Sequence, residues 1–210
     1  MLCPHCKHEI SEADFCPDCG KVLPVNEALS HYEALGYDQE KLQVDLADLE
    51  KRLFNLSKKF HPDRFASKSP LEVQLSHDRS SAINNAYRTL KDPITRAKYM
   101  VEKNLGSIEE KSAHVPMDMA DLFFEVQDAL DVIRDADGNP PEEAVQQVRQ
   151  AEKELNEKVK ELEADLQARF AEYDSACNKQ TLEQIKEILS ERSYIKSFLR
   201  QVDSVMNKEN

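Results

Sequence analysis

The chain has 210 residues, with 28 lysines and arginines against 40 aspartates and glutamates, and a formal net charge of −12. Four glycines, no tryptophan and a charged fraction of 32% favour long helices. No apolar run approaches the roughly 20 residues that cross a bilayer, and the N-terminus lacks the basic and apolar regions of a secretory signal. We therefore expect an intracellular protein that is not an integral membrane protein.

The negative charge lies mainly in the second half of the chain. Residues 106–210 carry 13 basic and 24 acidic side chains, whereas residues 26–105 carry 13 and 12. Binding to nucleic-acid phosphates requires clustered lysines and arginines, so the acidic half argues against general nucleic-acid binding. Most of its acidic side chains fit a solvated helix face.

Breaker residues separate a short N-terminal segment from the helices that follow. Residues 1–25 hold four of the five cysteines and are too few to build a hydrophobic core of their own. After this segment, Asn26 is expected to cap a short helix that extends through Leu35 and ends at Gly36.

An apolar stripe predicts the main helix of the middle segment. Its members recur at spacings of three and four, which places them on one helix face. They are Leu42, Leu46, Leu49, Leu53, Leu56 and Phe60. Pro62 ends this helix, because the residue before a proline is disfavoured in the α region. Two further helices are expected over residues 71–90 and 94–103, separated by Asp92-Pro93.

The last segment predicts longer helices in an antiparallel bundle. The first begins near Pro116 and ends at the turn sequence of residues 137–141. The second starts at the proline pair in that turn, which is a favoured helix N-terminus. The second and third helices carry narrow apolar stripes, which fit a helix bundle. Because no strand pattern occurs beyond the N-terminal segment, the sequence predicts a mainly α fold.

The N-terminal segment contains two Cys-x-x-Cys pairs, Cys3 with Cys6 and Cys16 with Cys19, separated by nine residues. Four thiolates at this spacing can hold one tetrahedral ion at about 2.3 Å, and Gly20 suits the tight turn after the second pair. We predict one structural zinc ion, although iron would fit the same ligands. A redox role for these cysteines is less favoured, because a thioredoxin-type motif occurs singly in a βαβ unit and this segment shows no such unit. Disulfides are also not expected in a reducing compartment.

A second motif, His61-Pro62-Asp63, lies in the loop after the leucine-striped helix. Charged and polar residues on that helix fall on the face away from the stripe. They are Lys51, Asn55, Lys58 and Lys59. This positive face next to the loop would meet an acidic partner surface and speed the encounter.

Residues 26–105 resemble a J-domain, the module by which co-chaperones engage DnaK-class heat-shock ATPases. The run Lys59–Phe65 is similar to the HscB family, the J-proteins of iron–sulfur cluster assembly. The run Ser81–Pro93, followed by Arg96-Ala97 and Tyr99, resembles the same family. The family also carries an acidic helical bundle at the C-terminus, and its animal-type members additionally have a four-cysteine knuckle similar to residues 3–19.

The resemblance implies three parts: a zinc-binding four-cysteine knuckle at residues 1–25, a helical J-domain hairpin at residues 26–105 and a three-helix bundle at residues 106–210. It implies a co-chaperone, not an enzyme, that binds an IscU-type iron–sulfur scaffold protein and stimulates the ATPase of a DnaK/HscA-class chaperone. ATP belongs to that chaperone, since this sequence has no Gly-rich phosphate loop. A bacterial cytoplasm is expected, with the mitochondrial matrix as the alternative.

The J-domain resemblance also implies the chaperone-binding residues. In J-domains the His-Pro-Asp loop docks on the ATPase, and His61, Pro62 and Asp63 match it directly. Pro62 would reduce the entropy lost on docking, and Asp63 offers a carboxylate to an arginine of the partner. The neighbouring helix adds Lys51, Arg52, Asn55, Lys58 and Lys59 to this predicted surface.

In the family, the scaffold-binding patch lies on the first bundle helix and on an aromatic residue of the last. The usual Phe-Leu-Met-Glu run is replaced here by residues 117–121, Met-Asp-Met-Ala-Asp. The apolar and acidic pattern downstream persists, which implies a patch of Met119, Phe123, Phe124, Glu125, Asp128 and Tyr194. Phe123 and Phe124 could equally both belong to the core, since helical aromatics are mostly buried.

Two alternatives remain open at this point. The altered patch is compatible with a J-protein that serves a different client. The four cysteines are compatible with a rubredoxin-like iron protein that transfers electrons. An enzyme that uses His61 and Asp63 with a metal would need further ligands at an open position, and the sequence offers no such spacing.

Overall fold

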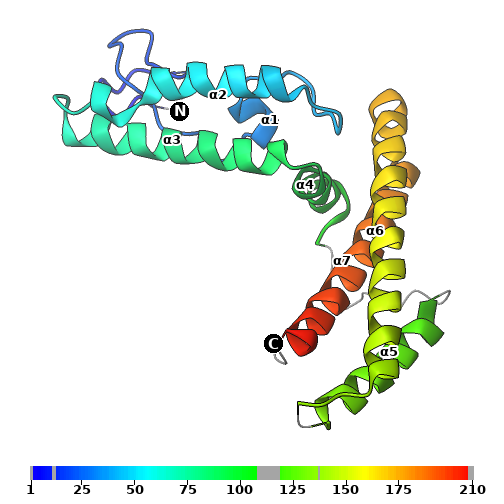
Figure 1. Cartoon of the computed structure of the whole chain (residues 1–210). Coiled ribbons are helices and arrows are strands. Elements are labelled where there is room, and N and C mark those ends of the chain that lie inside the picture. The colour runs from blue at the N-terminus through cyan, green and yellow to red at the C-terminus, as the bar shows by residue number, and fades with distance from the viewer. Residues whose placement is uncertain (1, 11–12, 108–118, 137, 208–210) are drawn as a thin grey trace. The chain divides into compact units, whose positions relative to one another are not determined.

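The computed structural model describes residues 2–10, 13–107, 119–136 and 138–207. These residues contain seven α-helices, one short 3-10 helix and two isolated β-bridges, both within residues 2–22 (Figure 1). The predicted mainly α fold is confirmed. No helix in this part of the chain is long and apolar enough to cross a membrane.

The chain forms two compact units, Met1–Arg96 and Ala97–Asn210. The boundary falls inside helix α4, which spans Pro93–Leu105. The cysteine-rich N-terminal segment therefore belongs to the same unit as the hairpin that follows it. The division into three parts at residues 25 and 105 stays a prediction.

Two antiparallel helices dominate the first unit. Helix α2 spans Leu46–Phe60 and helix α3 spans Pro70–Lys91, and the 3-10 helix η1 (Pro62–Arg64) lies in the loop between them. Figure 1 shows α2 and α3 side by side, and the short helix α1 (His31–Ala34) packs against α3.

The first helix starts later than expected. Ser30, not Asn26, caps α1: its hydroxyl accepts the backbone N–H of Glu33, and the Glu33 carboxylate accepts the N–H of Ser30. This reciprocal capping box satisfies two N–H groups that have no partner inside the helix. The Asn26 side chain instead accepts the N–H of Ala28 in a turn.

The leucine stripe is shorter on α2 than predicted. Leu42 precedes the helix, although its side chain is fully buried. Leu46, in the first turn of α2, is 48% exposed. The apolar stripe therefore begins one turn before the first buried residue of the helix, Leu49. Leu49 and Phe60 are buried as expected. The helix ends at Phe60, and the proline two residues later explains this end.

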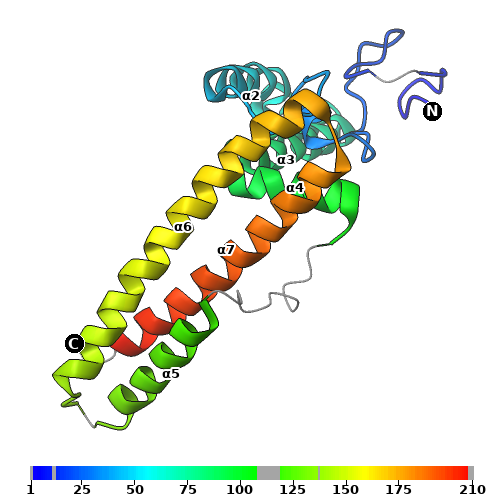
Figure 2. The same cartoon turned by 90° about the vertical axis from the view of Figure 1, so that its right-hand side faces the viewer.

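The second unit is a three-helix bundle of α5 (Ala120–Arg134), α6 (Glu142–Ala176) and α7 (Lys179–Met206). Figure 2 shows α6 and α7 alongside each other, with α5 next to the start of α6. Their shared core consists of Val126, Ala129, Leu130, Ile133, Ala144, Val148, Ala151, Val202 and Val205. The predicted helix start near Pro116 lies outside the described residues.

Candidate functional site

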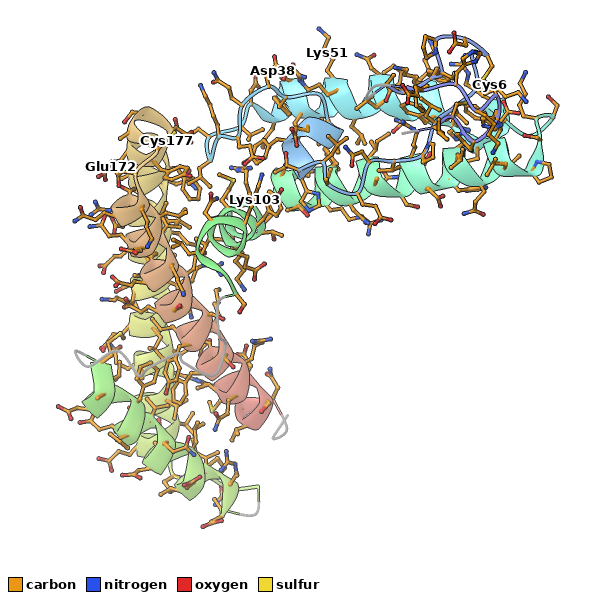
Figure 3. The ribbon with its side chains drawn as sticks, turned by 180° about the vertical axis from the view of Figure 1, so that it is seen from behind. Cys6, Asp38, Lys51, Lys103, Glu172 and Cys177 are labelled. Atoms are coloured by element: carbon orange, nitrogen blue, oxygen red, sulfur yellow. The ribbon has the colours of Figure 1, made fainter. Side chains whose placement is uncertain are left out.

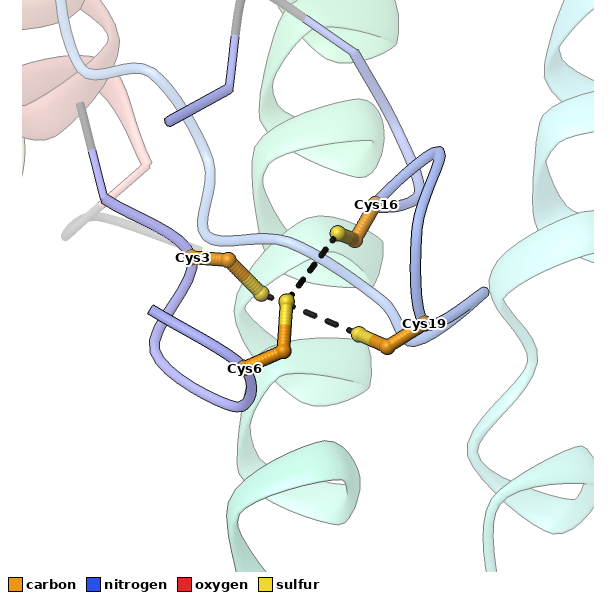
Figure 4. Close-up of side chains that lie close together, drawn as sticks. All are labelled: Cys3, Cys6, Cys16 and Cys19. Atoms are coloured by element: carbon orange, nitrogen blue, oxygen red, sulfur yellow. Dashed lines mark hydrogen bonds between the residues drawn. The ribbon is translucent and has the colours of Figure 1, made fainter. Parts of the chain in front are cut away.

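The four N-terminal cysteines converge on one point. The Sγ atoms of Cys3 and Cys19 are 3.8 Å apart, those of Cys6 and Cys16 are 3.7 Å apart, and all four lie within 4.8 Å of one another. Figure 4 shows the four side chains pointing toward a common centre. A tetrahedral ion with metal–sulfur bonds of about 2.3 Å places its sulfurs about 3.8 Å apart. The cluster therefore fits a metal ion.

Two similar turns position these cysteines. In the first turn the N–H of Lys7 donates to the carbonyl of Cys3 at 3.0 Å, and in the second the N–H of Gly20 donates to the carbonyl of Cys16 at 2.9 Å. Lys7 and Gly20 have φ values of 65° and 67°, in the region that favours glycine. The expected role of Gly20 in a tight turn is confirmed, and Lys7 occupies the equivalent position without being a glycine.

The clustered thiols favour one thiolate, at Cys3, and oppose ionisation of Cys6. Burial disfavours the Cys3 thiolate, but the N–H groups of Cys6 and His5 and the nearby thiols outweigh it and lower the pKa of Cys3 to about 6. At Cys6 the N–H of His8 favours the thiolate, but burial and the surrounding thiols outweigh it and raise the pKa to about 12. A bound divalent cation would stabilise all four thiolates together, as metal binding to cysteines requires.

The His-Pro-Asp loop is an exposed turn with internal hydrogen bonds. The Nδ1 atom of His61 accepts the N–H of Asp63 at 3.3 Å, and the N–H of Phe65 donates to the carbonyl of Pro62 at 2.8 Å. Phe65 is buried, whereas the side chains of His61 and Asp63 are 56% and 88% exposed. The loop thus presents two polar side chains on an ordered backbone.

Some side chains of the predicted basic face of α2 are exposed to solvent, and others are bonded to residues of the same unit. The exposed ones are Lys51, Asn55 and Lys58, and Figure 3 shows Lys51 projecting away from the helix. Arg52, by contrast, donates to Asp48 at 2.7 Å and to the carbonyl of Gly36, and its guanidinium lies 4.0 Å from the ring centroid of Tyr37. Arg52 therefore links the start of α2 to the turn after α1.

Lys59 contacts the cysteine knuckle, which we define as residues 2–10 and 13–25. Its ammonium group donates to Asp14 at 2.5 Å and lies about 5 Å from the rings of Phe15 and Phe60, which stack on each other. Arg79 of α3 pairs with the same carboxylate. Burial opposes the charge of Asp14, but the two cations outweigh it and lower its pKa. The knuckle is therefore held beside the His-Pro-Asp loop.

The neighbouring phenylalanines of α5 have opposite environments. Phe123 is 5% exposed, and its ring meets those of Tyr194 and Phe198 edge-on at centroid distances of 5.0 and 4.8 Å. Phe124 is 70% exposed. The structure thus places Phe123 in the bundle core and Phe124 on the surface, with Tyr194 half-buried behind Phe123.

The outer side of α5 carries the remaining residues of the predicted patch. Glu125 and Asp128 are exposed; Asp128 follows Phe124 by one helical turn, whereas Glu125 is its immediate neighbour in the chain. Met119 is half-buried at the N-cap of the helix. Val132, which is 48% exposed, continues this side. No sequence signal predicts this exposure, since a valine in a helix usually indicates core. Residues 117 and 118 lie outside the described part of the chain.

Comparison with known proteins relates these features to a family. The chain matches the DnaJ domain over residues 30–99. A co-chaperone protein HscB homolog from Aliivibrio salmonicida is 32% identical over 119 residues, covering 56% of this chain and 67% of that protein. The iron-sulfur cluster co-chaperone protein HscB of Homo sapiens is 28% identical over 186 residues, covering 86% of this chain and 70% of that protein.

Solved structures extend the likeness in fold. The crystal structure of human co-chaperone protein HscB has a TM-score of 0.67 at 20% identity and covers 99% of this chain and 98% of its own. Chaperone HscB from Vibrio cholerae has a TM-score of 0.59 at 20% identity and covers 86% of this chain and 99% of its own.

The helical hairpin, its exposed His-Pro-Asp turn and the DnaJ-domain match together define a J-domain co-chaperone. The sequence relatives cover more of the chain than that domain alone. The chain belongs to the HscB family, the J-protein co-chaperones of iron–sulfur cluster assembly.

Proposed function

We propose that this chain binds an IscU-type iron–sulfur scaffold protein through its bundle, presents it to a DnaK/HscA-class chaperone and stimulates the ATPase of that chaperone. The observation that carries the proposal is the His-Pro-Asp turn, which exposes its polar side chains on a backbone ordered by internal hydrogen bonds. In this scheme the chaperone binds and hydrolyses ATP, and the chain itself is not an enzyme. Several relatives are bacterial proteins, so we place the reaction in a bacterial cytoplasm, with the mitochondrial matrix as the alternative.

The chaperone-binding surface combines an ordered loop with steering charges. Pro62 restricts the backbone of the loop, so less conformational entropy is lost on docking. The exposed carboxylate of Asp63 suits a bidentate arginine of the partner. Lys51 and Lys58 add positive charge that speeds the encounter with an acidic surface. Arg52 is the weaker candidate, because its guanidinium is already paired within its own domain.

The scaffold-binding surface is the outer side of α5. Phe124 supplies an exposed aromatic ring, and Glu125 and Asp128 add negative charge next to it. Val132 extends the apolar part of this surface by two turns. Such a surface suits a partner with an apolar pocket and a basic rim, since buried aromatic anchors dominate binding energy and rim charges set specificity.

One zinc ion would hold the knuckle together. Cys3, Cys6, Cys16 and Cys19 would supply four thiolates, and a closed site of this kind is typical of structural zinc. When bound, the ion supplies a cross-link between the two turns and no redox chemistry. Metal analysis and the colour of the purified protein distinguish colourless zinc from a rubredoxin-like iron centre.

Chelation tests whether this ion acts on the knuckle alone. Small metal sites fold on binding their ion, whereas the helices bury apolar faces of their own. Chelation should unfold the knuckle and leave the helical circular dichroism nearly unchanged. A broad loss of helix on chelation would contradict this modular role.

A J-protein for a different client is the second candidate, because residues 117–121 lack the usual Phe-Leu-Met-Glu run. A pull-down with the cognate scaffold protein distinguishes the two. Retention of the scaffold by the wild type, with a marked loss on Asp128→Lys, supports the proposed client. No retention of the scaffold by the wild type would favour the second candidate.

A further inference from the structure

A basic groove lies between the knuckle and the His-Pro-Asp loop. It has a volume of about 410 Å³ and is lined by Lys21 and Phe15 of the knuckle, Lys59 of α2, Arg64 of η1, and Phe65 and Lys68 just beyond it. We propose that this groove binds an acidic, extended segment of the chaperone, so that the knuckle forms part of the chaperone-binding surface. This inference rests on the proposed function and adds a second contact to the His-Pro-Asp loop.

The charge of the groove argues for an acidic occupant. Four lining residues are cations, and within the described part of the chain Glu72 is the lining carboxylate. Glu72 is 7% exposed, and its carboxylate accepts the N–H and the hydroxyl of Ser69 in the capping box at the start of α3. Lys21, Arg64 and Lys68 are exposed, and none of them forms a salt bridge with the described residues. Lys59 is already paired with Asp14, and Lys21 lies close enough to Glu72 to help lower the pKa of that carboxyl. A bound carboxylate therefore meets three cations that have no salt-bridge partner among the described residues.

The groove is continuous with the proposed docking loop. Arg64 and Phe65 directly follow Asp63, and Lys59 precedes His61 by two residues. A partner chain that reaches the Asp63 carboxylate therefore lies next to the groove. The rings of Phe15 and Phe65 supply an apolar part of the lining that can cover the aliphatic portions of an acidic segment.

The knuckle is attached firmly enough to present Lys21 at a defined place. Arg79, whose side chain is 12% exposed, donates to the carbonyls of Leu23 and Pro24 at 2.7 and 3.2 Å and pairs with Asp14. These bonds join α3 to the two residues that follow Val22 and to the loop before the second cysteine pair. Because the knuckle is bonded to α3 on both sides of Lys21, the backbone at Lys21 is held in place and its side chain lines the groove at a defined position.

Charge reversal at two knuckle lysines tests the proposal. Lys21→Glu changes a groove residue, and Lys7→Glu makes the same change on the same knuckle, where the Lys7 ammonium contacts only the carbonyl of Pro4 among the described residues. Each full-length variant is titrated into a single-turnover ATPase assay of the DnaK/HscA-class chaperone. We expect Lys21→Glu and Lys68→Glu each to raise the half-maximal concentration about five-fold at low salt, and less at high salt. Lys7→Glu should leave it unchanged.

The outcomes separate the groove from the proposed function. Equal half-maximal concentrations for Lys21→Glu and Lys7→Glu overturn the groove proposal, whether both variants are weakened or neither is. Metal content and circular dichroism of the two variants should match, which shows that the knuckle is still folded. In the same assay His61→Gln should abolish stimulation. Full stimulation by His61→Gln overturns the proposed function, whereas an inactive His61→Gln with an unaffected Lys21→Glu overturns the groove alone.

Discussion

The adjacent phenylalanines of α5 provide a matched pair of substitutions. Phe123→Ala removes a ring that is 5% exposed and packs edge-on against Tyr194 and Phe198. Loss of this burial and the cavity left behind should cost about 3–5 kcal/mol. Phe124→Ala removes a ring that is 70% exposed. Its cost should be about 0.5 kcal/mol or less, because surface substitutions have small effects and alanine has the higher helix propensity.

Urea unfolding of the full chain, followed by circular dichroism, measures both costs in the same helix and for the same side-chain change. A loss of 3 kcal/mol lowers the melting temperature of the unit Ala97–Asn210 by about 12 °C. Scaffold binding should change in the opposite order, with Phe124→Ala weakening it by about 2 kcal/mol, as expected for an aromatic anchor. A large loss of stability in Phe124→Ala would place that ring in the core and remove it from the patch.

Three further substitutions test other parts of the structure. Cys177 lies between α6 and α7 with φ of 47°, so Cys177→Gly should raise the stability of the bundle by about 0.5 kcal/mol; a lower denaturation midpoint would argue against strain there. Arg52→Ala should cost about 1 kcal/mol because it removes the hydrogen bonds to Asp48 and to the carbonyl of Gly36 and the contact with the Tyr37 ring, whereas Lys51→Ala should leave the midpoint unchanged. The hydrogen bonds from Ser69 outweigh burial and lower the pKa of Glu72. The extra free energy of unfolding of the wild type over Glu72→Gln is therefore fully present above the ordinary glutamate pKa of about 4.3. This difference should disappear as the pH falls through the lowered pKa, and a constant difference down to pH of about 2 would refute the assignment.

Local signals explain which elements could be predicted from the sequence. Apolar spacing and proline stops act within a few residues, so the order of the long helices and the end of α2 followed directly. The predicted start of α1 at Asn26 is wrong, because Asn26 and Ser30 are both residues that cap helices well. The Ser30-x-x-Glu33 pattern was the signal that distinguishes them, since it completes a capping box.

Among the site residues, too, those close together in the sequence could be predicted, and contacts between distant residues could not. The cysteine spacing contains the whole candidate metal site, because its four cysteines lie within seventeen residues of chain. The pairing of Lys59 with Asp14 joins residues 45 positions apart, and helical periodicity carries no information at that distance. Phe123 and Phe124 point about 100° apart on a helix, and an apolar face of that width could bury both. Only the packing of Phe123 against Tyr194 and Phe198 of α7 shows which ring lies in the core.

The most direct test of the co-chaperone mechanism is the effect of Asp63→Asn on the chaperone's single-turnover ATPase. The Asp63 side chain is 88% exposed, so the substitution should change stability by no more than about 0.5 kcal/mol and leave scaffold binding intact. Lys58→Glu serves as the control for steering charges: its association should be slower than that of the wild type at low salt, and this difference should shrink as the salt concentration rises. We predict that Asp63→Asn abolishes stimulation at every salt concentration. Stimulation equal to that of the wild type would show that the His-Pro-Asp loop does not couple this chain to the chaperone.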